Sequence, residues 1–162
     1  MKHSGNSNLI YRRGAGVIVF IAILFPSALF GMALTVDHGR VLLASRQSAD
    51  IADSVVMAAA SARTGDGDVI EQPEAVNRAL ATFQRAKSYG MLSPNVQATL
   101  SPADIVFGSD GRTVKVTLKW EVTSLPLFKI FFPELTGIGG TSTRSARICI
   151  AELDDRPCAY PV

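Results

Sequence analysis

The chain has 162 residues, which is enough for one membrane anchor and one modest domain and excludes a multidomain enzyme. Apolar residues make up 48% and charged residues 19%, and the mean hydropathy of +0.24 excludes a disordered chain and indicates that part lies in lipid. All 14 acidic residues lie at or after Asp37, whereas Lys2, Arg12 and Arg13 precede it. Residues 37–162 therefore have no basic excess, which disfavours a nucleic-acid-binding protein.

Residues 14–36 form an apolar segment without one ionisable side chain. A helix needs about 20 such residues to cross a bilayer core, so this segment predicts a single transmembrane helix. The basic side chains precede it, so residues 1–13 are expected to be a cytoplasmic tip, with residues 37–162 outside the plasma (inner) membrane. A cleaved signal peptide is the alternative, although its apolar part usually spans only about 7 to 15 residues.

Small residues recur at four-residue steps along this segment, at Ser27, Gly31, Thr35 and Gly39. In a helix they fall along one face, which lets a second membrane helix approach closely. Small residues are also common in membrane helices that have no partner, so both interpretations stay open. Pro26 interrupts the helical hydrogen bonding and predicts a mild kink.

Beyond the membrane the helical pattern continues, so residues 37–63 are expected to be an extracytoplasmic extension of the helix. Asp37 and Arg40 stand three residues apart at the membrane exit, where they either mark the interface as a pair or contact a partner. Asp50 and Asp53 are expected to be solvated. The residues that keep the helical spacing are apolar or small, namely Val41, Ala44, Ser48, Ile51, Val55, Ala59 and Ala62.

Residues 64–162 are expected to form a small exported α+β domain. It begins with a glycine- and aspartate-rich loop that lacks the full ligand set of a calcium site. A second helix is predicted to start at Pro73 and Glu74 and to stop near Gly90. Strands are predicted over residues 96–100, 105–107, 113–122 and 144–153, with a hairpin turn at 108–111 and a flexible loop at 137–140.

The predicted fold class is therefore α+β. A long N-terminal transmembrane helix continues outside the membrane and is followed by a small antiparallel sheet with one packed helix.

Cys149 and Cys158 are the two cysteines of the chain, and outside the membrane they would meet oxidising conditions. A disulfide between them would stabilise a domain whose hydrophobic core is small. Two buried thiols are the main alternative. A redox or metal role is disfavoured because neither cysteine has a second cysteine or a histidine at motif spacing.

The stretch between Pro126 and Pro133 is rich in phenylalanine, and its prolines exclude a central sheet strand. Its apolar side chains either complete the core or form an exposed docking patch that meets the bilayer surface or another subunit. These side chains are Phe128, Ile130, Phe131 and Phe132.

The sequence holds no recognisable catalytic constellation. His3 and His38 lie on opposite sides of the predicted membrane, so they cannot share a triad or a metal site. The serines have neither a G-x-S-x-G elbow nor a paired base. We therefore expect no enzymatic activity, no cofactor, no metal, no nucleic acid and no small-molecule substrate.

Four features of residues 12–62 occur together: an Arg12-Arg13-Gly14-Ala15 start, Pro26 within the apolar helix, a V-D-x-G-R exit at residues 36–40, and an Ala- and Asp-rich segment over 47–62. In this combination the segment resembles the N-terminal part of the TadE/TadG-like proteins of the Flp (tight adherence) pilus system. The resemblance covers about a third of the chain. The remainder agrees with that family only as a short exported α+β part.

The resemblance implies a single-pass, pseudopilin-like or minor-pilin-like component that helps to build adhesive pili, with other pilus-assembly membrane subunits as partners. Pilin-type substrates carry a glutamate five residues after the cleavage glycine, but here that position is Val19 after Gly14, or Ile21 after Gly16. An uncleaved, anchored accessory protein, closer to the TadG-like members, therefore fits better than a fibre subunit. The alternative function is a membrane-tethered module that binds or senses a ligand outside the cell.

Overall fold

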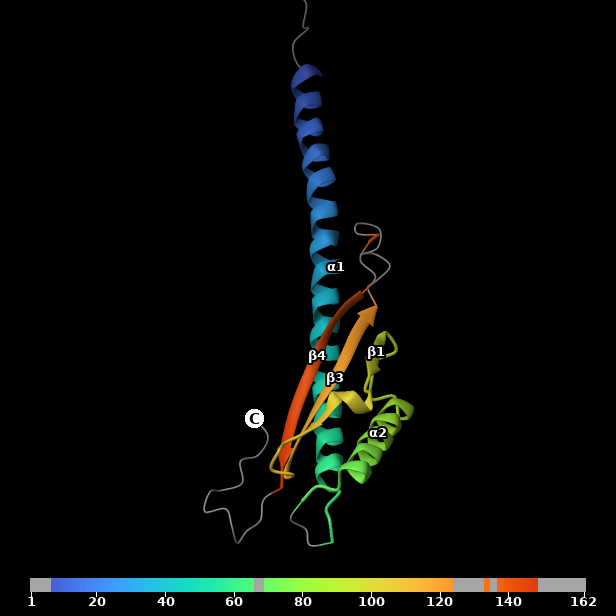
Figure 1. Cartoon of the computed structure of the whole chain (residues 1–162). Helices are drawn as coiled ribbons and strands as arrows, with labels where there is room; N and C mark the ends of the chain where they lie inside the picture. Colours follow the sequence, from blue (N-terminus) through green and yellow to red (C-terminus); the bar gives the residue numbers. More distant parts are fainter. Residues whose placement is uncertain (1–6, 66–68, 124–132, 135–136, 149–162) are drawn as a thin grey trace, which may run out of the picture. The chain divides into compact units, whose positions relative to one another are not determined.

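The computed structural model describes residues 7–65, 69–123, 133–134 and 137–148. It has a long apolar N-terminal helix, a second helix and a small antiparallel sheet (Figure 1). The chain divides into two compact units, Met1–His38 and Gly39–Val162, and the boundary falls within the first helix. The elements are α1 (Ser7–Ala60), α2 (Gln72–Ser88), β1 (Val96–Thr99), the 3-10 turn η1 (Pro102–Asp104), β2 (Ile105–Phe107), β3 (Thr113–Thr123) and β4 (Gly137–Arg147).

Strand β3 is the centre of the sheet, and every pairing to it is antiparallel. Strands β1 and β2 share one edge of β3, with Val96 opposite Val122 and Ile105 opposite Val116. Strand β4 pairs along the whole of the other edge. The predicted hairpin turn between β2 and β3 is confirmed, and Gly111 occupies the left-handed region at φ +65°.

The helical spacing predicted from Val41 to Ala62 is confirmed, and the structure shows that these residues form a buried face. Six of the seven residues are completely buried, and Val41 packs against them at the rim of the core. The last of the six, Ala62, lies just beyond the end of α1 at Ala60. The period-two pattern of β3 is also confirmed, because its alternate apolar residues from Val114 to Val122 are buried while their neighbours face outward. These two faces join in one hydrophobic cluster, so the second half of α1 belongs to the core of the Gly39–Val162 unit.

Helix α2 also contributes to this cluster, through Ala75, Ala79, Phe83 and Ala86. Its predicted bounds are confirmed to within two residues: Pro73 lies in its first turn, and Gly90 follows its end at φ +68°. The inner face of the sheet therefore carries two helices, where the sequence predicted one. The outer face carries none in the described part of the chain.

Strand β4 differs from the prediction. It starts at Gly137 and ends at Arg147, so residues 137–140 are strand and not the expected flexible loop. Gly140 lies opposite Trp120, and a Cβ atom at position 140 would come within 2.8 Å of Cζ2 of the indole. The glycine is needed because the ring lies against the bare backbone of β4. Pairing with β3 outweighs the weak strand propensity of glycine, which is why local sequence predicted a loop.

Replacing Gly140 with alanine is expected to displace this indole and to lower the free energy of unfolding by about 1 to 3 kcal/mol through overpacking. Trp120 is the single tryptophan and is 8% exposed, so its emission should shift as the ring moves towards water. Urea unfolding followed by fluorescence measures both effects. Ser145→Ala, on the outer face of the same strand, is the control. Equal behaviour of the two variants would contradict the close packing.

Candidate functional site

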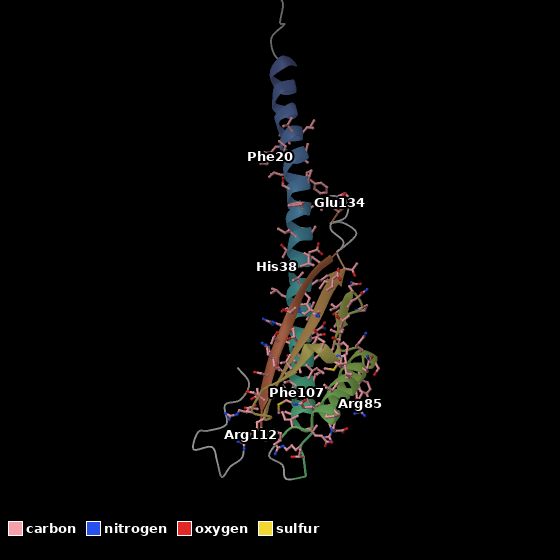
Figure 2. The ribbon with its side chains drawn as sticks, in the orientation of Figure 1. Phe20, His38, Arg85, Phe107, Arg112 and Glu134 are labelled. Atoms are coloured by element: carbon pink, nitrogen blue, oxygen red, sulfur yellow. The ribbon has the colours of Figure 1, made fainter. Side chains whose placement is uncertain are left out.

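The first candidate site is the apolar first half of α1. In the described part of the chain, α1 is the one helix long and apolar enough to cross a membrane, by length and composition. Over residues 16–36 every side chain is exposed except Ala33, which is half-buried. Phe20, which is 64% exposed, points away from the helix axis (Figure 2). A soluble protein rarely leaves so large an apolar surface uncovered, so this surface is suited to contact lipid or another protein.

The predicted packing face of this helix is open. Ser27, Gly31, Thr35 and Gly39 are all exposed, and a Cβ atom added to either glycine would meet nothing within 4 Å. The Ser27 hydroxyl donates to the Ile23 carbonyl at 2.7 Å, and the Thr35 hydroxyl donates to the Gly31 carbonyl at 2.8 Å. Both hydroxyls are thus satisfied by their own helix, which leaves the face without an unpaired donor in an apolar medium.

The remaining predicted site residues are untested. Asp37 and Arg40 belong to different compact units, so their pairing stays a prediction. Cys149 and Cys158 lie outside the described residues, as does the apolar patch of Phe128, Ile130, Phe131 and Phe132. The disulfide and the docking patch therefore stay predictions as well.

Asp53 was expected to be solvated; its side chain is 42% exposed, and it also has an ion-pair partner that the sequence did not predict. Its Oδ1 lies 2.8 Å from Nε of Arg144, which is on the inner face of β4. Arg144 also donates from Nη1 to the carbonyl of Thr143 at 3.1 Å. In the described part of the chain β4 pairs only with β3, and an inward-pointing charged side chain discourages pairing of an open edge with a foreign strand. Sequence spacing held no signal for this contact, because Asp53 and Arg144 are far apart in the chain.

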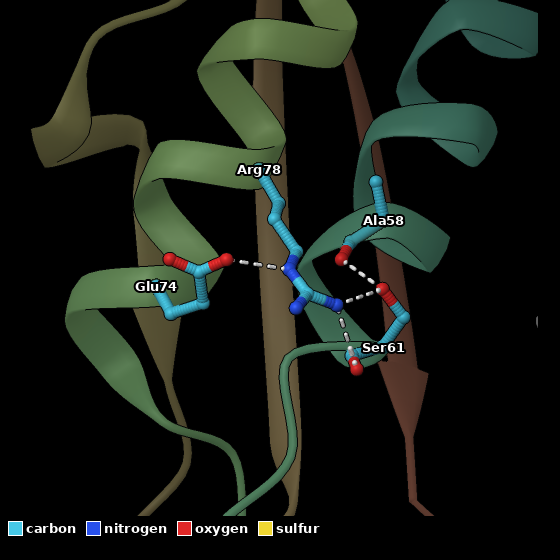
Figure 3. A network of polar contacts seen from close by, with 4 residues as sticks. All are labelled: Ala58, Ser61, Glu74 and Arg78. Carbon is cyan, nitrogen blue, oxygen red and sulfur yellow. Dashed lines mark hydrogen bonds and ion pairs between the residues drawn. The ribbon is translucent and has the colours of Figure 1, made fainter.

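A second polar network ties the end of α1 to α2 (Figure 3). Arg78 donates from Nε to Oε1 of Glu74 at 2.8 Å, a pair that the i,i+4 spacing could have revealed. Its Nη1 also donates to the carbonyl of Ser61 at 3.1 Å and to its hydroxyl oxygen at 3.3 Å. The guanidinium thereby joins the Arg63 N–H, at 3.1 Å, as a donor to a carbonyl just beyond the end of α1.

The outer face of the sheet has a shallow groove of about 220 Å³. The groove runs across β1, β3 and β4 over the bare backbone at Gly139, and the outward-facing side chains that line it are polar. Small-molecule sites are usually deep clefts or cavities that bury most of the ligand, so this shallow groove is a poor candidate for one. Its lining residues are Gln97, Thr99, Lys119, Trp120, Glu121 and Gly139.

The positive charge of Lys119, next to this groove, is used in an ion pair that holds the fold together. The Lys119 ammonium, 2.9 Å from Oδ1 of Asp104, and the Ser101 hydroxyl, 2.6 Å from Oδ2, lower the pKa of Asp104 from 3.8 to about 2. The Asp104 side chain is 13% exposed, and it also accepts the backbone N–H of Ser101 at the start of η1. The carboxylate therefore holds the turn between β1 and β2 onto β3.

The described residues contain no group of three or more His, Cys, Asp or Glu side chains that could hold a metal ion. The polar contacts above are ion pairs and capping interactions, and none joins a nucleophile to a base. Comparison with protein-family models, with curated proteins and with solved structures found no match.

The lowered pKa of Asp104 predicts an acid-sensitive contribution to stability. The folded carboxylate binds its proton less readily than the unfolded one, so the stabilisation is complete above about pH 4 and is lost as the pH falls through 2. Asp104→Asn should therefore cost about 1 kcal/mol at pH 7, after allowance for solvent screening, and much less at pH 2. Thermal unfolding between pH 2 and pH 7 measures this difference. A constant difference across that range would show that charge is not the cause.

Proposed function

We propose that the protein is a single-pass, membrane-anchored structural component of a Flp (tight adherence) pilus assembly, minor-pilin-like or accessory in role. Residues 14–36 would cross the plasma membrane with the N-terminus in the cytoplasm, and the Gly39–Val162 unit would lie outside. Its partners would be the bilayer and other pilus-assembly membrane subunits. The proposal includes no enzymatic activity. The polar contacts described above are ion pairs and capping interactions, and none joins a nucleophile to a base.

The observation that carries this proposal is the change in surroundings along α1. Residues 16–36 are apolar and exposed, whereas residues 44–59 bury one face in the core of a folded unit. A helix that is apolar all round needs lipid or close neighbours, and one with a single apolar face needs a core. One continuous helix that combines the two suits a subunit held in a bilayer and folded outside it.

The resemblance of residues 12–62 to TadE/TadG-like proteins supplies the pilus context, and the exposed small-residue face of α1 supplies a way to contact other membrane subunits. The alternative, a tethered ligand-binding module, would need a pocket. The polar groove on the sheet does not favour it.

Intact-mass measurement of the protein in washed membranes and in the soluble exported fraction tests the anchor. We expect the full-length chain in the membrane and none in the soluble fraction. A soluble product that starts near Leu34 would mean a cleaved signal peptide and would overturn the proposal. Loss of only the first 14 or so residues would mean pilin-like processing and would move the protein from an accessory role into the fibre.

The packing face is tested by Gly31→Ile. The larger side chain should keep another helix from approaching and should lower co-purification of pilus-assembly membrane subunits by about five-fold or more. Ala22→Ile is the matched control, because nine residues along a helix place it on the opposite side. Unchanged co-purification with Gly31→Ile, or an equal loss with Ala22→Ile, would remove the packing claim.

A further inference from the structure

The second half of α1 carries an exposed stripe opposite its buried face. Four of its side chains are Leu43, Arg46, Asp50 and Met57, which fall within a narrow arc at 3.6 residues per turn. Leu43 is 50% exposed and Met57 is 57% exposed, so two large apolar side chains flank a pair of opposite charges. The stripe lies within the Gly39–Val162 unit and is separate from the apolar segment.

The two charges of this stripe do not pair with each other. Within the described residues neither Arg46 nor Asp50 takes part in an ion pair. Glu74 and Arg78 have the same spacing on α2 and do pair, at 2.8 Å. The difference follows the order of the charges, because an acidic residue four positions before a basic one is favoured over the reverse. Arg46 and Asp50 therefore remain available to opposite charges on another surface.

The rest of the stripe allows a second helix to approach. Ser54 lies between Asp50 and Met57, and its hydroxyl donates to the Asp50 carbonyl at 3.0 Å, which leaves no unpaired donor. Gly39 lies at the start of the stripe, and a Cβ atom there would meet nothing within 4 Å. A helix with small residues, apolar residues and one self-complementary charge pair is suited to contact a copy of itself.

We propose that this stripe is the contact surface for a second copy of the chain, in a parallel, two-fold symmetric pair of α1 helices. Arg46 of each copy reaches about one helical turn along the pair to Asp50 of the other, and Leu43 and Met57 meet their own counterparts on either side of the charges. The parallel direction rests on the proposed function, because two copies anchored in one membrane point the same way. Four residues of helix span about 6 Å, a distance that an arginine side chain reaches across.

Charge complementarity favours a second copy of the chain as the partner of this stripe. In a symmetric pair each Arg46 meets an Asp50, so both charges of both copies are satisfied. A lipid surface would satisfy only one sign of charge. The open edge of β4 is a poorer contact surface, because Arg144 points inward there and is held by Asp53. Confinement to one membrane raises the local concentration of the two copies, so a small contact suffices.

The contact is tested in membranes with the full-length chain. A photo-crosslinking amino acid in place of Met57 should give an adduct of twice the chain mass, whereas the same probe in place of Gln84, an exposed residue of α2, should not. Arg46→Asp or Asp50→Arg should each lower the Met57 adduct by about five-fold or more, through like-charge repulsion. The double variant R46D/D50R should restore it. A Met57 adduct of any other mass, or one unaffected by both single changes, would overturn the proposal.

Co-expression of the two single variants under different tags gives a second test. R46D makes the stripe wholly acidic and D50R makes it wholly basic, so the two variants should pair with each other and not with themselves. Failure to fold would abolish pairing of every kind, so recovery of the mixed pair can come only from charge complementarity. Absence of the mixed pair, with both variants showing the thermal unfolding of the parent chain, would overturn the proposal.

Membrane retention is scored in the same samples and separates the two proposals. A chain retained in the membrane without an adduct overturns the contact and leaves the anchor in place. A soluble chain that still gives the adduct overturns the anchor and supports the contact.

Discussion

The burial of one face of α1 against the inner face of the sheet is the constraint on which the Gly39–Val162 unit depends. Residues such as Ile51 and Val55 are completely buried, and complete burial of a side chain of this size contributes about 1.5 to 3 kcal/mol. Alanine and serine fill much of the rest of this face. Without this helix the inner face of a four-stranded sheet would be largely uncovered, since α2 covers it with only four buried residues.

The polar contacts follow from this packing. Once α1 lies on the sheet, charges between the two layers must pair, and Arg144 reaches Asp53 because both stand where β4 passes the helix. Gln47 accepts hydrogen bonds from the backbone N–H and the hydroxyl of Ser93, both at 3.1 Å, and so ties the loop after α2 to the same helix. Among the described residues, the charged side chains on the side of α1 that faces away from the sheet have no such partners. Its free charges are those for which we propose a second copy.

Under the proposed function, the two halves of α1 lie in different surroundings, a bilayer and the core of a folded unit. In a bilayer every backbone polar group needs a partner within the segment, and a continuous helix through Pro26, with Ser27 and Thr35 bonded back to their own turns, comes near to meeting that demand. In the folded unit the helix needs only one apolar face. This division supports the proposed structural role, because the proposed anchor, the core of the folded unit and the proposed contact surface all use α1.

Local sequence determined the features that depend on local periodicity. The apolar segment, the buried face from Ala44 to Ala62, the alternation of β3 and the turn that ends at Gly111 could all be predicted, because each follows from spacing within one stretch of chain. Tertiary structure alone decided that Gly137–Gly140 is strand, that Asp53 is paired and that two helices share one face of the sheet. Each of these depends on a residue far away in the chain: Trp120 against Gly140, Arg144 against Asp53, and β3 beneath both helices. Contacts between residues that are distant in the chain leave no periodic pattern in a single sequence. The sequence therefore determined which residues share an apolar face of a helix or strand, and the fold decided which other elements those faces contact.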